Sequence, residues 1–177
     1  TNRSTPVAVA GPSTVASPKP SLCVHTWALL TDGTARCWGR NNFSQLGDGT
    51  STDRPVPVTV SGLANATTIT VGTTHSCARL NDGTAKCWGD NSGGQLGDHS
   101  TVLVRSTAVA VVKPRSLSTV AQVAHSYSRC ALLKSGGVSC WGSNTYGQVG
   151  DGTTIDRLVP ASVAGITNAT AISGGCA

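Results

Sequence analysis

Cysteine is the residue type in this chain best suited to do chemistry, and four of its seven cysteines fall into two matched pairs. Cys77 and Cys87 flank one short polar turn, and Cys130 and Cys140 flank another. A hairpin loop of three residues that ends in a left-handed glycine places the members of each pair directly opposite each other. Directly opposed Cβ atoms lie about 4.5–5.5 Å apart, so we predict two hairpin disulfides.

The other three cysteines have no such partner. Trp27 occupies the position opposite Cys37, and a bridge from Cys37 to Cys23 would require the intervening strand to bend. Cys23 and Cys176 occupy equivalent positions in the repeat described below. We hypothesise that Cys23, Cys37 and Cys176 cross-link successive segments or separate chains.

Metal binding and catalysis are poorly supported by the remaining candidates. The cysteines lack the closely spaced pairs of a four-ligand zinc site, and Asp48-Gly49-Thr50 lacks the alternating oxygen donors of a calcium loop. Ser76 directly follows His75, and neighbours on a strand point to opposite faces, so they cannot act together as nucleophile and base. We expect no metal, no cofactor and no enzymatic activity.

A sequence repeat defines the elements that position these residues. Cys-Trp-Gly occurs three times, at Trp38, Trp88 and Trp141, and each copy is followed by a polar Asn-x-x-x-Gln loop and then by Leu-Gly-Asp or Val-Gly-Asp. Arginines at equivalent positions recur about every 51 residues: Arg3, Arg54, Arg105 and Arg157. A fixed period of this length indicates a repeat architecture.

The repeat divides the chain into segments 1–51, 52–102 and 103–154, with a partial fourth at 155–177, or about 3.4 repeats. Strands are predicted in the second repeat at 56–60, 68–71, 76–80 and 84–88, from alternating apolar residues and turn signals. One small sheet of four antiparallel strands cannot bury both faces alone, whereas radial stacking of such sheets can. The fold class predicted is therefore all-β, with β-propeller blades of four antiparallel strands.

The equivalent positions of the three tryptophans indicate packing between blades rather than a stacking series for sugars or bases. The Asn and Gln side chains of the polar loops are expected to hydrogen-bond to their own turns.

The composition argues against two classes of protein, those that span a membrane and those that bind nucleic acids. Aromatic residues are only 4% of the chain, methionine is absent, and no stretch is apolar enough to cross a membrane. The net charge of +5 comes from basic residues that are scattered singly, which argues against nucleic-acid binding. Hairpin disulfides indicate an oxidising compartment: extracellular, cell surface or periplasmic.

The repeat resembles that of the regulator of chromosome condensation family, and the resemblance covers essentially the whole chain. It is carried in the second repeat by Gly72–Ala78, Asp82-Gly83-Thr84, Cys87-Trp88-Gly89, Asn91 and Gly94–Gly97. The family forms seven-bladed β-propellers, and the cysteines make this chain more similar to exported bacterial members. The third repeat departs from the pattern, with Ser128 in place of His and His125 in place of Gly.

The resemblance implies that this chain supplies about half of a ring. The rest would come from a longer chain, from other chains, or from packing on another protein, and self-association through open blade ends is therefore one expectation. We interpret the chain as a non-catalytic module for protein recognition or assembly. Carbohydrate binding is an alternative. The resemblance implies two more: inhibition of a secreted enzyme, and guanine nucleotide exchange on a small GTPase. Hairpin disulfides disfavour the last of these.

Candidate binding residues lie where the repeats differ at a loop end. They are Thr73, Thr74, His125, Ser126, Tyr127 and Arg129. Tyr127 is the predicted anchor, because a tyrosine combines an apolar ring with a polar end.

Overall fold

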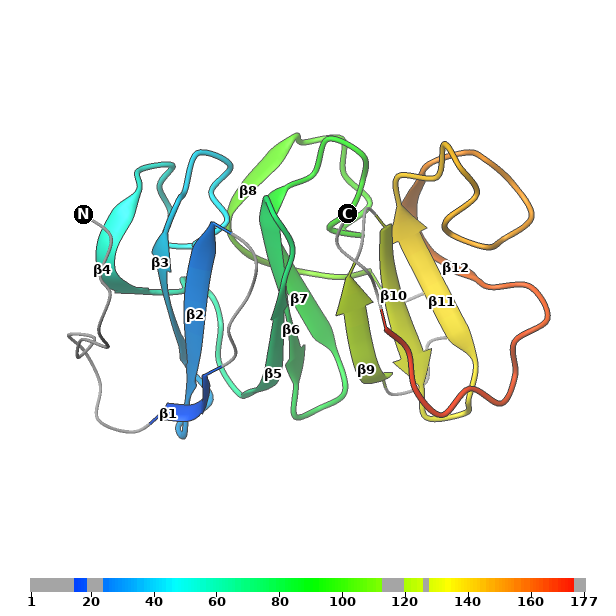
Figure 1. Ribbon diagram of the computed structural model, residues 1–177, viewed down its shortest axis with the longest axis horizontal. Helices are drawn as coiled ribbons and strands as arrows, with labels where there is room; N and C mark the ends of the chain where they lie inside the picture. The colour runs from blue at the N-terminus through cyan, green and yellow to red at the C-terminus, as the bar shows by residue number, and fades with distance from the viewer. Residues whose placement is uncertain (1–14, 19–23, 113–119, 126–127, 174–177) are drawn as a thin grey trace, which may run out of the picture.

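The computed structural model describes residues 15–18, 24–112, 120–125 and 128–173 of this chain. Three four-stranded antiparallel sheets stand side by side in it (Figure 1). This all-β, bladed arrangement confirms the fold class predicted from the repeat.

Each sheet consists of four strands that are consecutive in the sequence, in the orders β1-β2-β3-β4, β5-β6-β7-β8 and β9-β10-β11-β12. The strands are β1 (Val15–Pro18), β2 (His25–Leu30), β3 (Ala35–Gly39), β4 (Arg54–Thr59), β5 (Ala66–Val71), β6 (His75–Leu80), β7 (Ala85–Asp90), β8 (Val104–Ala110), β9 (Val120–His125), β10 (Ser128–Leu133), β11 (Val138–Gly142) and β12 (Arg157–Ser162). We call the three sheets blade 1, blade 2 and blade 3.

Blades and sequence repeats are offset by one strand. The strand that opens each repeat after its arginine pairs backwards: β4 pairs with β3 through Cys37↔Val58, and β8 pairs with β7 through Cys87↔Val109. Each blade therefore takes its outermost strand from the following repeat. This exchange ties neighbouring repeats together, because no repeat completes a sheet alone.

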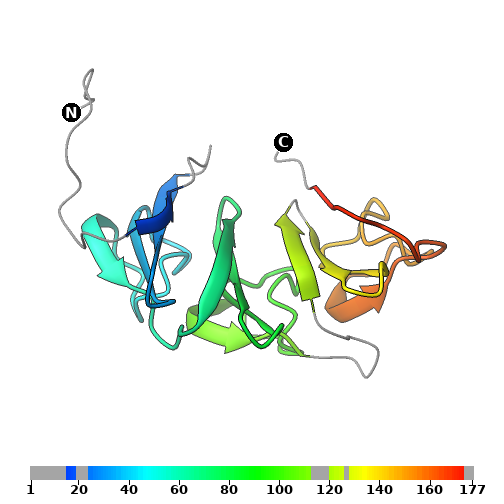
Figure 2. The ribbon, with the colours of Figure 1, turned by 90° about the horizontal axis from the view of Figure 1, so that it is seen from below.

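The blades fan out in an arc (Figure 2). The strands β1, β5 and β9 lie toward its concave side, and β4, β8 and β12 toward its convex side. The polar loops that join β3 to β4, β7 to β8 and β11 to β12 all lie at one end of the sheets (Figure 1).

Two apolar cores fill the spaces between blades. Leu29, Ala35 and Leu46 of blade 1 are buried with Ile69 and Trp88 of blade 2. An equivalent cluster joins blade 2 to blade 3 around Leu96 and Trp141. Blade 3 has a third cluster, on which Ala169 and Ile172 pack from the segment that follows β12.

The residues described here contain no helix that is long and apolar enough to cross a membrane.

Candidate binding face and the joints between blades

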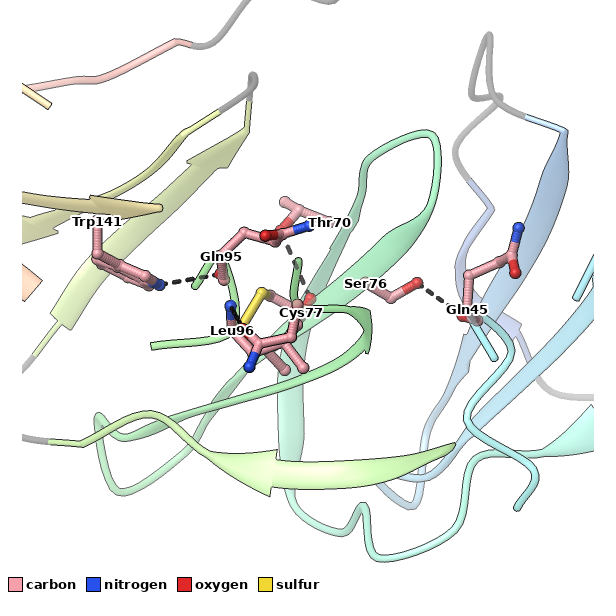
Figure 3. The surroundings of a disulfide bond; sticks show 9 residues. Gln45, Thr70, Ser76, Cys77, Gln95, Leu96 and Trp141 are labelled. Atoms are coloured by element: carbon pink, nitrogen blue, oxygen red, sulfur yellow. Dashed lines mark hydrogen bonds between the residues drawn. A yellow bond between two sulfur atoms is a disulfide. The ribbon is translucent and has the colours of Figure 1, made fainter. Parts of the chain in front are cut away.

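Both predicted disulfides are present. Cys77 lies opposite Cys87 and Cys130 opposite Cys140, each pair with a Cα–Cα distance of 4.1 Å. The bonds join the two central strands of blades 2 and 3, and Figure 3 shows the first of them beside the joint with blade 3.

Blade 1 lacks this bond, as the sequence predicted, because Trp27 lies opposite Cys37. Cys37 is a free, fully buried cysteine, and burial raises the pKa of its thiol. A second chain could reach this sulfur only if blade 1 opened. Cys23 and Cys176 lie outside the described residues, so their cross-linking remains a hypothesis.

Each joint between blades is built around a tryptophan of Cys-Trp-Gly, which confirms the packing role expected for Trp88 and Trp141. Trp88 Nε1 of blade 2 donates to the carbonyl oxygen of Gln45 in the polar loop of blade 1, at 2.9 Å. Trp141 Nε1 of blade 3 donates to the Gln95 carbonyl of blade 2 at 3.1 Å (Figure 3). Both indoles are buried, so the hydrogen bonds satisfy donors that water cannot reach.

A glycine in each polar loop makes room for the indole. A Cβ added at Gly47 would lie 2.7 Å from Cδ1 of Trp88, and one at Gly97 would lie 2.6 Å from Nε1 of Trp141. Both glycines also have positive φ, 69° and 64°. Glycine is therefore required in the Leu-Gly-Asp motif for two reasons: the indole of the next blade leaves no room for a Cβ, and the turn has positive φ.

A histidine and a serine complete the joint between blades 1 and 2. Ser76 Oγ donates to the Gln45 carbonyl at 3.0 Å, so its lone pair is left to accept a hydrogen bond from Nε2 of His25, also at 3.0 Å. Burial lowers the pKa of His25 to about 4, which keeps the imidazole neutral at physiological pH.

Arg129 occupies the position in blade 3 that Ser76 occupies in blade 2, and here the structure differs from the prediction. Its side chain is fully buried rather than exposed on a recognition loop. Burial lowers the pKa of Arg129 to about 9, while the negative charge of Asp90 opposes that shift. The guanidinium therefore stays charged at neutral pH and belongs to the joint between blades 2 and 3.

The other predicted binding residues divide between the described and undescribed parts of the chain. Thr73 is exposed, and Thr74 is half-buried beside the start of a polar loop, where its carbonyl accepts from Asp90 N at 2.9 Å. The backbone of His125 ends β9. The side chain of His125 and the whole of Ser126 and Tyr127 lie outside the described residues.

The polar loops are held by their asparagines, as expected from the sequence. In the third loop Asn144 Nδ2 donates to the carbonyls of Thr153 and Ile155, at 2.9 and 3.1 Å, and its Oδ1 accepts from Val149 N at 2.8 Å. The same network surrounds Asn41 and Asn91. Each glutamine also accepts a hydrogen bond within its own turn.

The recurrent arginines pair with the aspartates of these loops. Arg54 Nε lies 2.7 Å from Asp48 Oδ2, and the pairs Arg105–Asp98 and Arg157–Asp151 repeat the contact at 2.7 and 2.5 Å. A hydrogen bond from Thr153, together with Arg157, lowers the pKa of Asp151 to about 2. These aspartates are committed to turns and ion pairs, and the described residues contain no cluster of three metal-ligating side chains.

We call the end of the sheets formed by the β3–β4, β7–β8 and β11–β12 loops the loop face. It carries exposed apolar side chains that were not among the predicted binding residues. Tyr146 is 91% exposed, Leu103 and Ile155 are each 65% exposed, and Val102 is 48% exposed. These side chains could have been found by comparing equivalent positions of the repeats, because apolar or aromatic residues there replace others. Val102 and Ile155 replace Thr52 of the first loop, and Leu103 and Tyr146 replace Asp53 and Phe43.

Comparisons with known proteins define the family. The model of the regulator of chromosome condensation (RCC1) repeat matches residues 32–79 and 135–177, and a second model of the same repeat matches residues 66–95. This chain therefore belongs to the RCC1-repeat family, and its blades are RCC1-type propeller blades.

Similar proteins include the ultraviolet-B receptor UVR8 of Arabidopsis thaliana, 32% identical over 142 residues, or 78% of this chain and 32% of the receptor. Among solved structures, yeast RCC1 (Prp20) bound to Kap60 is similar over 95% of this chain and 42% of the matched chain, with a TM-score of 0.80 and 19% identity. Human WBSCR16 is similar over 86% of this chain and 40% of its own, with a TM-score of 0.74 and 22% identity. This chain thus spans 32–42% of the length of these proteins.

Proposed function

We propose that this chain is a non-catalytic binding module that recognises a protein through its polar-loop face, in an oxidising compartment. The observation that carries the proposal is the presence of exposed apolar side chains on loops whose backbones are held by hydrogen bonds from their own asparagine and glutamine side chains. A loop that is already ordered loses little conformational entropy on binding, which favours its use for recognition.

Tyr146 and Ile155 illustrate this pre-organisation. Asn144 and Gln148 hydrogen-bond to the backbone of the loop that presents both residues. Their exposed side chains have little to contact within the chain, and burial of such apolar surface against a partner contributes about 25 cal/mol per Å². Thr73 and Thr74 lie at the same end of the sheets and extend the proposed surface with hydroxyl groups.

The compartment is inferred from the disulfides. Two hairpin bonds between central strands would not persist in the reducing cytosol, so an extracellular, cell-surface or periplasmic location is favoured. Alkylation of the native protein before and after reduction tests this inference. Four thiols that appear only after reduction would support it, and their free reaction in the protein as isolated would contradict it.

A protein partner is favoured by two solved structures of similar proteins. One is yeast RCC1 (Prp20) bound to Kap60, and the other is Prp20p of Saccharomyces cerevisiae, which has binding properties to Gsp1p and histones. These partners are those of the yeast protein, and at 19–20% identity they support only the general idea that such a propeller binds proteins. Exchange activity on a GTPase is a weaker candidate here because the disulfides disfavour a nuclear or cytosolic site.

The test is affinity capture from the extracellular or periplasmic fraction of the source, with loop variants as comparators. Tyr146→Ser and Leu103→Asp remove exposed apolar groups from the loop face. Val56→Thr is the matched control, because Val56 is 53% exposed but lies on the outer strand β4. We expect one captured protein to be lost with both loop variants and retained with the control.

Two other outcomes would contradict the proposal. Equal capture by the wild type and the loop variants would remove the loop face as the binding site. Selective binding on a glycan array, without a protein partner, would favour the carbohydrate alternative. Inhibition of a secreted enzyme would be one form of the proposed protein recognition and would be sensitive to the same loop variants.

A further inference from the structure

The second polar loop, which joins β7 to β8, departs from the first and third loops at positions where those two agree. Its aspartate and arginine, Asp98 and Arg105, are seven residues apart, whereas the equivalent residues are six apart in each of the other loops. The extra residue is Val104, because Val102 takes the place of Thr52 on the loop asparagine. Blade 2 packs on both blade 1 and blade 3, so this loop is seen with both neighbouring blades in place (Figure 1).

The insertion exchanges a carboxylate for exposed apolar side chains. In the first loop Asp53 Oδ1 accepts a hydrogen bond from Asn41 N at 2.7 Å, and the third loop repeats this bond. In the second loop Leu103 replaces the aspartate, and its backbone carbonyl accepts from Asn91 N, also at 2.7 Å. The loop therefore keeps the hydrogen bond without the negative charge. Three consecutive apolar side chains are exposed as a result: Val102 (48%), Leu103 (65%) and Val104 (39%).

A histidine in the second loop has a backbone conformation for which the other loops use glycine. His99 has a φ of 59°, and Gly49 and Gly152 at the equivalent positions have 87° and 82°. A side chain in this left-handed region costs free energy that glycine avoids. The imidazole is exposed, and no hydrogen bond joins it to another described residue. The fold of this turn needs only glycine, so the strained histidine indicates a role in binding.

The arginine of the second loop has hydrogen-bond donors that its own loop does not use. Arg54 and Arg157 each donate from Nε to the loop aspartate and from Nη2 to a threonine Oγ1, the latter at 3.3 Å. Arg105 Nε likewise donates to Asp98, at 2.7 Å. Ser100 stands at the threonine position, and within the described part of the chain Arg105 Nη2 makes no equivalent hydrogen bond. The Arg105 side chain is 32% exposed, so these terminal nitrogens can donate to a ligand.

One buried asparagine holds these groups on a single ordered turn. Asn91 Nδ2 donates to the carbonyls of Ser100 and Val102, at 3.2 and 2.9 Å. On the other side of the turn, His99 N donates to the carbonyl of Leu158 in blade 3 at 3.2 Å. The segment that carries the histidine and the apolar side chains is therefore fixed at both its centre and its edge. A ligand that binds to it does not have to order the loop first.

We propose that the second loop binds an acidic segment of a partner protein, in which an apolar side chain lies next to a carboxylate. The apolar side chain packs on the three exposed apolar residues of the loop, and the carboxylate accepts from Arg105 Nη2 and from the imidazole of His99. Charge complementarity assigns the carboxylate, because this loop lacks the second aspartate of the other loops, and its remaining one, Asp98, is 5% exposed and paired with Arg105. This inference rests on the proposed function, since it assigns the chemistry of the partner at one part of the loop face.

The first experiment selects ligands for the 177-residue chain from a library of short random peptides displayed on phage. The library is first depleted on a loop-exchange variant, in which residues 98–105 carry the sequence of residues 48–54. Blade 1 already folds with that sequence, so the exchange removes the proposed site and keeps the turn. We expect the enriched peptides to carry Asp or Glu beside a large apolar residue. Enriched peptides without a carboxylate, or no enrichment over the exchange variant, would overturn the proposal.

Two point variants then test the donors, with an enriched peptide measured by fluorescence anisotropy. His99→Gly removes the imidazole and relieves the backbone, so it should weaken binding about threefold to tenfold without lowering the Tm. Ser100→Thr supplies the hydroxyl that holds Nη2 in the other loops and should weaken binding by a similar factor. Thr50→Ser is the matched control, because it makes the reverse exchange at the equivalent position of the first loop, and it should bind as the wild type does.

The outcomes separate this inference from the proposed function. Wild-type peptide affinity in both His99→Gly and Ser100→Thr would overturn the inference, whereas the proposed function would stand if Tyr146→Ser and Leu103→Asp still abolished protein capture. Conversely, protein capture that is insensitive to those two variants would remove the loop face as the site of protein recognition, while loss of peptide binding in His99→Gly would still support an acidic-peptide site on the second loop. Replacement of the peptide carboxylate by an amide should weaken binding to the wild type more than to His99→Gly, and equal effects would count against their contact.

Discussion

Replacement of Gly47 by alanine tests the joint between blades 1 and 2 directly, because the chain supplies a matched control two residues away. Gly47 and Gly49 both have positive φ, 69° and 87°. A Cβ at Gly47 would lie 2.7 Å from Cδ1 and 2.8 Å from Nε1 of Trp88, whereas a Cβ at Gly49 would have nothing within 4 Å. The two variants share the backbone cost and differ in the contacts of the added Cβ, which at Gly47 meets the indole most closely and also lies 3.0 Å from Cγ1 of Val60.

The size of each effect follows from these two terms. Alanine in the left-handed region costs about 1–2 kcal/mol, and restriction of the unfolded chain offsets about 0.4–1 kcal/mol of that. The net backbone cost is therefore about 1 kcal/mol of unfolding free energy in either variant, and for Gly49→Ala it is the whole effect. Overpacking against a buried side chain adds about 1–3 kcal/mol, so Gly47→Ala should lose about 2–4 kcal/mol in total.

Urea unfolding monitored by tryptophan fluorescence measures the difference, since buried indoles report loss of the joints. A chain of this length should lose about 2–4 °C of Tm per kcal/mol, so thermal unfolding provides a second measurement. Equal destabilisation by the two variants would refute the reasoning, because it would mean that the indole does not constrain Gly47. Trp88→Leu adds a further check: it removes the aromatic ring, so Gly47→Ala should be less costly in that background.

Three further predictions follow from other parts of the structure. The pKa of His25 is lowered from 6.5 to about 4, so between these pH values the unfolded chain binds a proton at His25 that the folded chain does not. The free energy of unfolding should therefore be highest above pH 6.5 and fall by about 3 kcal/mol as the pH is lowered to 4. Removal of the Cys77–Cys87 bond, which closes a loop with a sequence separation of 10, should cost about 2–4 kcal/mol as measured by urea unfolding. Asn144→Asp replaces a buried amide donor that faces two carbonyls, and it should cost about 2–4 kcal/mol, whereas the same change at the exposed Asn42 should be nearly neutral.

Each of these predictions has its own control. For the histidine, a His25→Gln variant should lose most of the slope of stability against pH in that window, and an unchanged slope would assign the titration to other groups. For the disulfide, reductant should have no further effect on a Cys77→Ala, Cys87→Ala double variant beyond that on the second bond. For the asparagine, equal effects at Asn144 and Asn42 would contradict the hydrogen-bond network.

Local sequence determined the hairpins. The strand period of two and the tight turns place Cys77 opposite Cys87, and they equally place Trp27 opposite Cys37, so both the presence and the absence of a disulfide could be predicted. The recurrence of Cys-Trp-Gly at one repeat position likewise indicated packing between blades. These features depend on residues within about one turn of each other or on comparison of equivalent positions.

Only the tertiary structure decided which groups meet across blades and which side chains reach the surface. Arg129 was predicted at a recognition loop, but stacking of blade 3 on blade 2 buries it near Asp90. The hydrogen-bond partner of Trp88 is the backbone carbonyl of Gln45, 43 residues away. Every residue has a backbone carbonyl, so the sequence does not indicate which one accepts this hydrogen bond. The physical reason is that hairpin register is set by bonds within a few residues, whereas burial and contacts between blades are set by how whole sheets stack.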